Sequence, residues 1–104
     1  MNLNELQEVA GKWERKVEQH QNFLAFAEHL REEANEVEEA YYKGEDIAEQ
    51  LADIVIISAM AANYIGQPGM LEEAVKEKLA RVLQSTGYEE LDDRGIRRRD
   101  KTKE

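Results

Sequence analysis

Cysteine is absent from this chain, which excludes disulfide bonds, thiolate catalysis and zinc sites built on cysteine. A single proline and six glycines among 104 residues leave little material for the many turns of a loop-rich all-β fold. Positive charge is also scarce, with 14 Lys and Arg against 23 Asp and Glu, a net charge of −9. Because a phosphate backbone is held by clustered cations, we expect no nucleic-acid partner.

Long hydrophobic runs are missing as well. The most apolar stretch, residues 54–62, includes Ser58 and is far shorter than the roughly 20 residues that cross a membrane. The first ten residues contain Glu5 and Glu8 and no apolar run, which argues against a secretory signal. We therefore expect no membrane association and a cytoplasmic location.

Apolar residues recur every three or four positions along most of the chain, which is the period of an α-helix. The pattern predicts four helices, near residues 3–17, 23–43, 47–65 and 71–83. Gly11 interrupts the first of them, at a cost of about 1 kcal/mol relative to alanine. The predicted fold class is therefore all-α, a bundle of four helices joined by short connections.

The helical domain is expected to cover residues 1–91, and residues 92–104 differ from it in character. This last segment has six Lys or Arg, four Asp or Glu and one large apolar residue, Ile96. It cannot bury enough surface to offset the entropy of ordering, so we expect a mobile tail. The helix at 47–65 is apolar nearly all round, and one short chain has too few helices to cover it, which predicts a homodimer or homotetramer.

Carboxylates are concentrated between residues 28 and 53, where ten acidic side chains are accompanied by only two basic ones. Most of the ten fit a solvated helix face. Glu33 and Glu36, however, are neighbours on one helix at a spacing where like charges repel. Asp53 lies within the most apolar helix, where an unpaired carboxylate is costly. A divalent cation with oxygen ligands would neutralise these charges together, which predicts Mg²⁺, with Mn²⁺ as an alternative.

The segment Leu30–Glu36, followed by Glu49–Asp53, resembles the EExxE…ExxD signature of MazG-like nucleotide pyrophosphohydrolases, members of the all-α NTP pyrophosphatase superfamily. The resemblance implies that helix pairs from two subunits form a four-helix bundle with Mg²⁺ between the acidic helices. It also implies hydrolysis of a nucleoside triphosphate to the monophosphate and pyrophosphate. By the same resemblance, Glu33, Glu36 and Asp53 bind the metal, and Glu32 and Glu33 are catalytic residues.

One position departs from the signature, because Gln50 stands where the motif has a glutamate three residues before the aspartate. An amide is a weaker ligand for Mg²⁺ than a carboxylate. Glu49 precedes Asp53 by about one helical turn and lies about 40° from it around the helix. We therefore expect Glu49 to serve as a further metal ligand.

Four more side chains are candidates for contact with the substrate, each with a simpler structural alternative. Trp13 could stack on a base, or it packs in the apolar stripe of its helix. His20 lies in a polar connection where the family places its base-recognising loop. Asn63 and Lys78 resemble family residues that approach the nucleotide, although an asparagine bonded to the backbone fits Asn63 equally well. His29 is expected to be a hydrogen-bonded or surface histidine, because Mg²⁺ prefers oxygen ligands.

These features together predict a Mg²⁺-dependent hydrolase that converts (d)NTP to (d)NMP and pyrophosphate and so cleans the nucleotide pool. The alternative is a non-catalytic helical dimerisation or regulatory module, in which Gln50 marks a degraded site. A nucleic-acid adaptor that uses Arg97–Arg99 is disfavoured by the net negative charge.

Overall fold

The structure, a computed structural model, describes residues 1–91 and 95–98. Its helices are α1 (Leu3–Val17), α2 (Phe23–Lys43), α3 (Ile47–Ile65) and α4 (Met70–Ser85), followed by the short strands β1 (Tyr88–Leu91) and β2 (Gly95–Arg98). The predicted all-α class and the predicted helix positions are confirmed. Contacts divide the chain into two compact units, Met1–Leu71 and the residues from Glu72 onwards.

Polar side chains at the helix starts explain where the first three helices begin. Asn2, Asn22 and Asp46 each precede a helix in extended conformation and accept a hydrogen bond from a backbone N–H of its first turn. These bonds satisfy donors that have no partner inside the helix. Gly44 ends α2 in the left-handed region at a φ of 72°, a conformation that costs glycine little.

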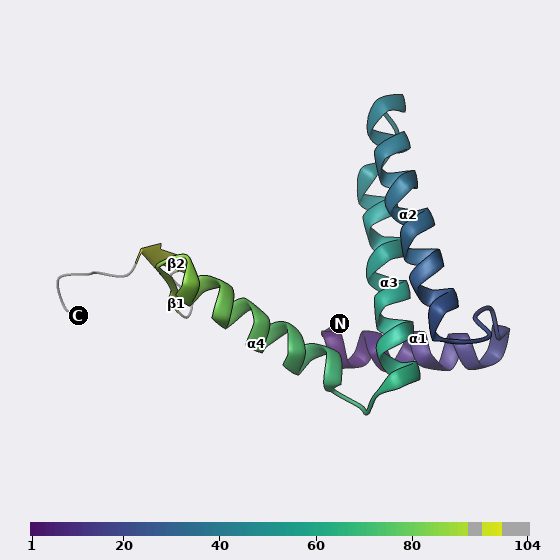
Figure 1. Ribbon diagram of the computed structural model, residues 1–104, viewed down its shortest axis with the longest axis horizontal. Helices are drawn as coiled ribbons and strands as arrows, with labels where there is room; N and C mark the ends of the chain where they lie inside the picture. Colours follow the sequence, from purple (N-terminus) through teal and green to yellow (C-terminus); the bar gives the residue numbers. More distant parts are fainter. Residues whose placement is uncertain (92–94, 99–104) are drawn as a thin grey trace. The chain divides into compact units, whose positions relative to one another are not determined.

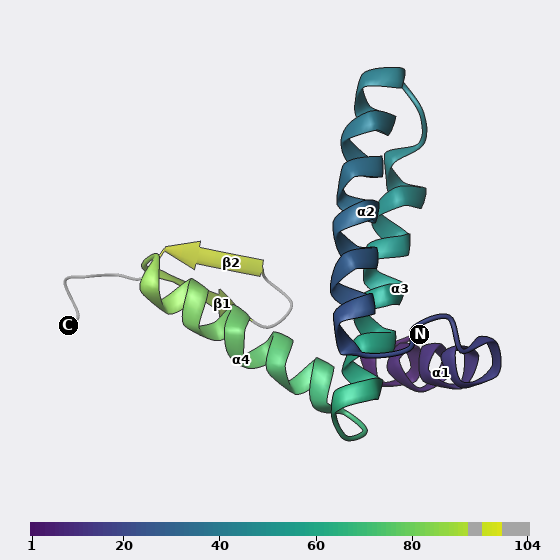
Figure 2. The same ribbon diagram turned by 45° about the vertical axis from the view of Figure 1, so that its right-hand side comes forward.

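In the first unit, α2 and α3 lie side by side as an antiparallel pair, and α1 crosses one end of that pair (Figure 1, Figure 2). The core forms where α1 and α2 meet the second half of α3. Its buried members are Ala10, Phe26, Ile57, Ala59, Met60 and Ala61, with Leu6, Leu30 and Leu71 packed around them. The small side chains on α3 let the other two helices approach it closely.

Gln7 fixes the end of α3 to α1. Its side chain is only 1% exposed, and its Nε2 donates to the backbone oxygen of Gln67 at 3.1 Å. Its Oε1 accepts from the backbone N–H of Leu71 at 3.2 Å. Because both ends of this buried amide are satisfied by the chain itself, the turn after α3 is held firmly against α1.

The second unit contains most of α4 and the antiparallel pair β1–β2, which the sequence analysis did not predict (Figure 2). The pairing places Tyr88 opposite Arg98 and Leu91 opposite Gly95. Residues 95–98 of the expected mobile tail therefore form a strand. The remainder of that expected tail, 92–94 and 99–104, lies outside the described residues, and the predicted domain boundary after residue 91 stays a prediction.

Large apolar side chains remain exposed on the first unit. Those on α1 and α3 are Val9, Trp13, Val17, Leu51, Val55, Ile56, Tyr64 and Ile65. Over the described residues, one chain thus leaves much of the apolar surface of α3 uncovered, in line with the predicted shortage of partner helices. Among the described residues, no single helix has both the length and the hydropathy of a membrane span. Only α3 and α4 counted together, with the break between them, meet these two criteria.

Candidate functional site

Two acidic residues from the sequence signature point into the contact between α2 and α3. Glu33, on α2, is 8% exposed although it is charged, and Asp53, on α3, is half-buried. Glu36 lies one turn beyond Glu33 on α2 and is exposed. Glu33 is on the same face as the core residues Phe26 and Ala40, since spacings of seven residues return to one side of a helix.

The other two carboxyl groups act on the pKa of Glu33. Burial raises this pKa above its ordinary value near 4.5, and the neighbouring Glu36 raises it further. The negative charge of Asp53 acts in the same direction, whereas His29 opposes them. The surroundings of Glu33 therefore disfavour its charged form.

Two buried oxygen atoms on α2 and α3, Oε2 of Glu33 and Oε1 of Gln50, have no hydrogen-bond partner among the described residues. Buried acceptors without a donor are rare in folded proteins, and oxygen acceptors next to carboxylates are the groups that a hard cation binds. Within the described part of the chain, no three His, Asp or Glu side chains are arranged to hold a metal ion together. A cation site here would therefore include the Gln50 amide.

The placement of Gln50 differs from the arrangement that the sequence suggested. Glu49, the predicted substitute ligand, is exposed in the first turn of α3, where its charge favours the helix dipole. Gln50 is half-buried, and its Oε1 has no access to solvent. The site-facing position before Asp53 is thus that of Gln50, and the exposed side chain of Glu32 lies on α2 next to Glu33.

A chain of three hydrogen-bonded side chains, Glu14, His20 and His29, runs from α1 toward Glu33, which His29 approaches at ion-pair distance without a hydrogen bond. Glu14 accepts the backbone N–H of His20 at 2.7 Å, and its other oxygen lies 2.9 Å from His20 Nδ1. His20 Nε2 lies 2.7 Å from His29 Nδ1, and His29 Nε2 lies 3.3 Å from Glu33 Oε1. The His20 ring stacks on Phe26 at a centroid distance of 4.1 Å, which fixes it in the core. His20 is thus a buried link in this chain, and its predicted contact with a base stays a prediction.

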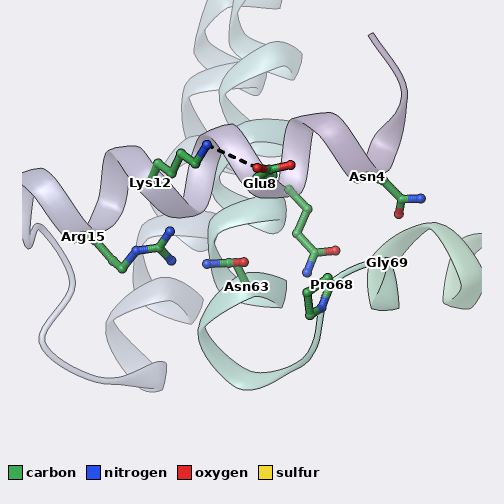
Figure 3. Close-up of a pocket in the computed structure, with 8 residues that line it drawn as sticks. Asn4, Glu8, Lys12, Arg15, Asn63, Pro68 and Gly69 are labelled. Atoms are coloured by element: carbon green, nitrogen blue, oxygen red, sulfur yellow. Dashed lines mark ion pairs between the residues drawn. The ribbon is translucent and has the colours of Figure 1, made fainter.

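A separate cavity of about 620 Å³ lies between α1 and the end of α3 (Figure 3). Asn63, predicted to contact substrate, lines it together with Asn4, Gln7, Glu8, Lys12, Arg15, Pro68 and Gly69. Gly11 makes this arrangement possible, because a Cβ at position 11 would overlap the Asn63 amide. Sequence reasoning missed this role of Gly11, although a glycine inside a helix was the available signal.

The remaining candidates have exposed side chains or lie in the second unit, and their contact with substrate stays a prediction. Trp13 is 57% exposed on α1 and is absent from the core of its own chain. Lys78 has an exposed side chain on α4, in the second unit. Arg97 and Arg98 belong to β2, and Arg99 lies outside the described residues.

Comparisons with models of protein families, with curated proteins and with solved structures each found no match for this chain. The function is therefore inferred from the residues and geometry of the chain itself.

Proposed function

We propose that this protein is a Mg²⁺-dependent nucleotide pyrophosphohydrolase with a MazG-like site between α2 and α3. The observation that carries the proposal is the pair of buried oxygens without donors, Glu33 Oε2 and Gln50 Oε1, beside the carboxyl groups of Glu36 and Asp53. These groups are the oxygen ligands that Mg²⁺ or Mn²⁺ prefers. A net charge of −9 leaves the protein few other means of binding a triphosphate.

Each residue of the site has a definite task in this reaction. Side-chain rotation would bring Glu33, Glu36 and Asp53 onto one cation, with the Gln50 amide oxygen as a neutral ligand, since the described residues hold no such cluster as they lie. When bound, the cation would screen the triphosphate and acidify water. Glu32 would accept the proton of the water whose oxygen bonds to the α-phosphorus, as the bond from that phosphorus to the bridging oxygen breaks. Pyrophosphate leaves with the bridging oxygen, and the nucleoside monophosphate remains.

Association of two or four copies is part of the proposal. The exposed apolar side chains of α3, among them Leu51, Val55 and Ile65, would be covered by a second copy. Such a pairing joins two α2–α3 pairs into a four-helix bundle. Light scattering at micromolar concentration should give a dimer or tetramer, and a 12.0 kDa monomer with full helicity would exclude this assembly.

The deciding experiment is a screen of common and damaged nucleotides for pyrophosphate release with Mg²⁺. Glu33→Gln and Asp53→Asn should each reduce turnover by about 100-fold or more, because each removes a ligand charge. Glu39→Gln is the matched control, since it removes one charge from an exposed position on α2. Equal activity of all three variants would exclude the proposed site.

The rival function is a non-catalytic dimerisation or regulatory module. Gln50 in place of a carboxylate and the uncovered apolar face of α3 favour it. Calorimetry separates the two functions, because the rival predicts no Mg²⁺ or Mn²⁺ uptake at millimolar metal.

A further inference from the structure

The cavity between α1 and the end of α3 is unusual in its charge. Residues 1–71 contain five Lys or Arg and 14 Asp or Glu, and three of those five cations fall within residues 12–16 of α1. Two of these three, Lys12 and Arg15, line the cavity. The cavity is therefore where the first unit, otherwise acidic, offers positive charge to a ligand.

Arg15 is available to such a ligand. Within the described part of the chain, no carboxylate lies within ion-pair distance of its guanidinium group, whereas Lys12 pairs with Glu8 at 3.2 Å through two largely exposed side chains. An exposed pair of this kind is weak and opens readily. Arginine presents a planar set of donors that matches the oxygens of a phosphate group.

The polar floor of the cavity is set by Asn63. Figure 3 shows the Arg15 side chain reaching toward the Asn63 amide, which faces the cavity from α3. This amide makes no hydrogen bond with any other described residue, so both its donor and its acceptor can serve a ligand. Gly11 gives it room against the backbone of α1.

The walls of the cavity are already in place without a ligand. The buried amide of Gln7 bonds to Gln67 and Leu71, which fixes the turn that carries Pro68 and Gly69. Gly69 itself adopts a φ of 82° and lies against Asn4. A volume of about 620 Å³ fits a small metabolite, since sites for such ligands measure roughly 300–1,000 Å³.

We propose that this cavity binds a phosphate monoester of nucleotide size or smaller, with its phosphate on Arg15 and Lys12 and its polar ring or hydroxyls on Asn63. The binding needs no divalent cation. It therefore stands apart from the metal-dependent site between α2 and α3 and does not rest on the proposed hydrolase activity.

The test is a titration of the full chain in EDTA, followed by the amide signals of ¹⁵N-labelled protein. The probes are AMP, ribose 5-phosphate and inorganic phosphate, with adenosine as the uncharged comparison. We expect saturable shifts of the Asn63 side-chain amide and the Gly11 and Gly69 backbone amides with at least one phosphate probe, and binding of adenosine about tenfold weaker than AMP. None of these signals moving at about 10 mM of any phosphate probe would overturn the proposal.

Matched variants separate a built site from general attraction to positive charge. Arg15→Gln should weaken the binding about tenfold, whereas Lys16→Gln removes the same charge from the same helix outside the cavity and should change it by less than about twofold. Equal losses in both variants would overturn the proposal. Glu39→Gln, at an exposed position of α2, should leave phosphate binding unchanged. Shifts that appear only when Mg²⁺ replaces EDTA would show that the phosphate occupies the α2–α3 site instead and would overturn the proposal.

Discussion

The charge of Glu33 should destabilise the protein whenever no cation is present. When ionised, its carboxylate lies 8% exposed beside Glu36 and Asp53, and its Oε2 has no donor. Like charges at this spacing on a helix cost about 0.2–0.5 kcal/mol, and an unsatisfied buried polar atom costs about 1–3 kcal/mol. Glu33→Gln removes the charge at nearly constant volume, and its new N–H groups can donate to Asp53 or to Gln50 Oε1.

The variant also loses the attraction between Glu33 and His29, which offsets part of these gains. We therefore expect Glu33→Gln to raise the free energy of unfolding by about 1 kcal/mol in EDTA at pH 7.5. For a chain of this size, this corresponds to an increase in Tm of about 4–8 °C. Added Mg²⁺ should stabilise the unmodified protein and leave the variant nearly unchanged, because ligand binding to the folded state requires the Glu33 charge.

The pH dependence follows from the raised pKa of Glu33. Below its ordinary value near 4.5, both folded and unfolded chains hold the proton, so the variant and the parent differ little. As pH rises above 4.5, the unfolded chain ionises first and the parent loses stability until the folded carboxyl group also ionises. The gain of the variant should thus be small at pH 4 and complete at pH 7.5.

Thermal unfolding in EDTA at both pH values, at one protein concentration, measures this directly. Glu38→Gln is the control, because it removes an exposed charge from the same helix. A Glu33→Gln variant that melts below the parent at pH 7.5, or whose gain is the same at pH 4, would refute the argument.

Three further predictions concern neighbouring residues. Glu14→Ala should lower the free energy of unfolding by about 2–4 kcal/mol, because two buried His20 donors lose their acceptor. Glu14→Gln should lower it clearly less, and equal losses in urea denaturation would count against the hydrogen-bonded chain. Gln50→Glu should strengthen Mn²⁺ binding in calorimetry about tenfold, and Glu49→Gln should change it by less than about twofold. Mg²⁺ at 100 times its Kd should raise the free energy of unfolding of the unmodified protein by about 2.7 kcal/mol relative to EDTA, and so raise its Tm. An unchanged Tm would argue against the metal site.

The helices were predictable because their causes are local. The period of apolar residues, the capping side chains Asn22 and Asp46, and Gly44 are all visible in sequence, and the structure has the helices at the expected positions. The proximity of Glu33 and Asp53 could also be predicted from the sequence, since both lie beside core positions of adjacent helices.

The spacing of residues in the sequence could not predict how α3 is rotated about its own axis. Glu49 lies closer to Asp53 around an ideal helix than Gln50 does, yet Gln50 is the half-buried residue and Glu49 is exposed, because the packing of the core sets that rotation. The link between His20 and His29 depends on how the loop folds back over Phe26, which no local pattern encodes.

Gly11 and Asn63 form one steric unit across two helices, and this constrains the order in which the sequence can change. A Cβ at position 11 would overlap the Asn63 amide as it lies, so a larger residue 11 requires the Asn63 side chain to turn away or to become smaller. The two positions should therefore vary together among descendants of this chain. In a random library, Gly11→Ala should be recovered mainly alongside Asn63→Gly, Asn63→Ala or Asn63→Ser, even though Gly11 is among the positions where alanine would otherwise strengthen a helix.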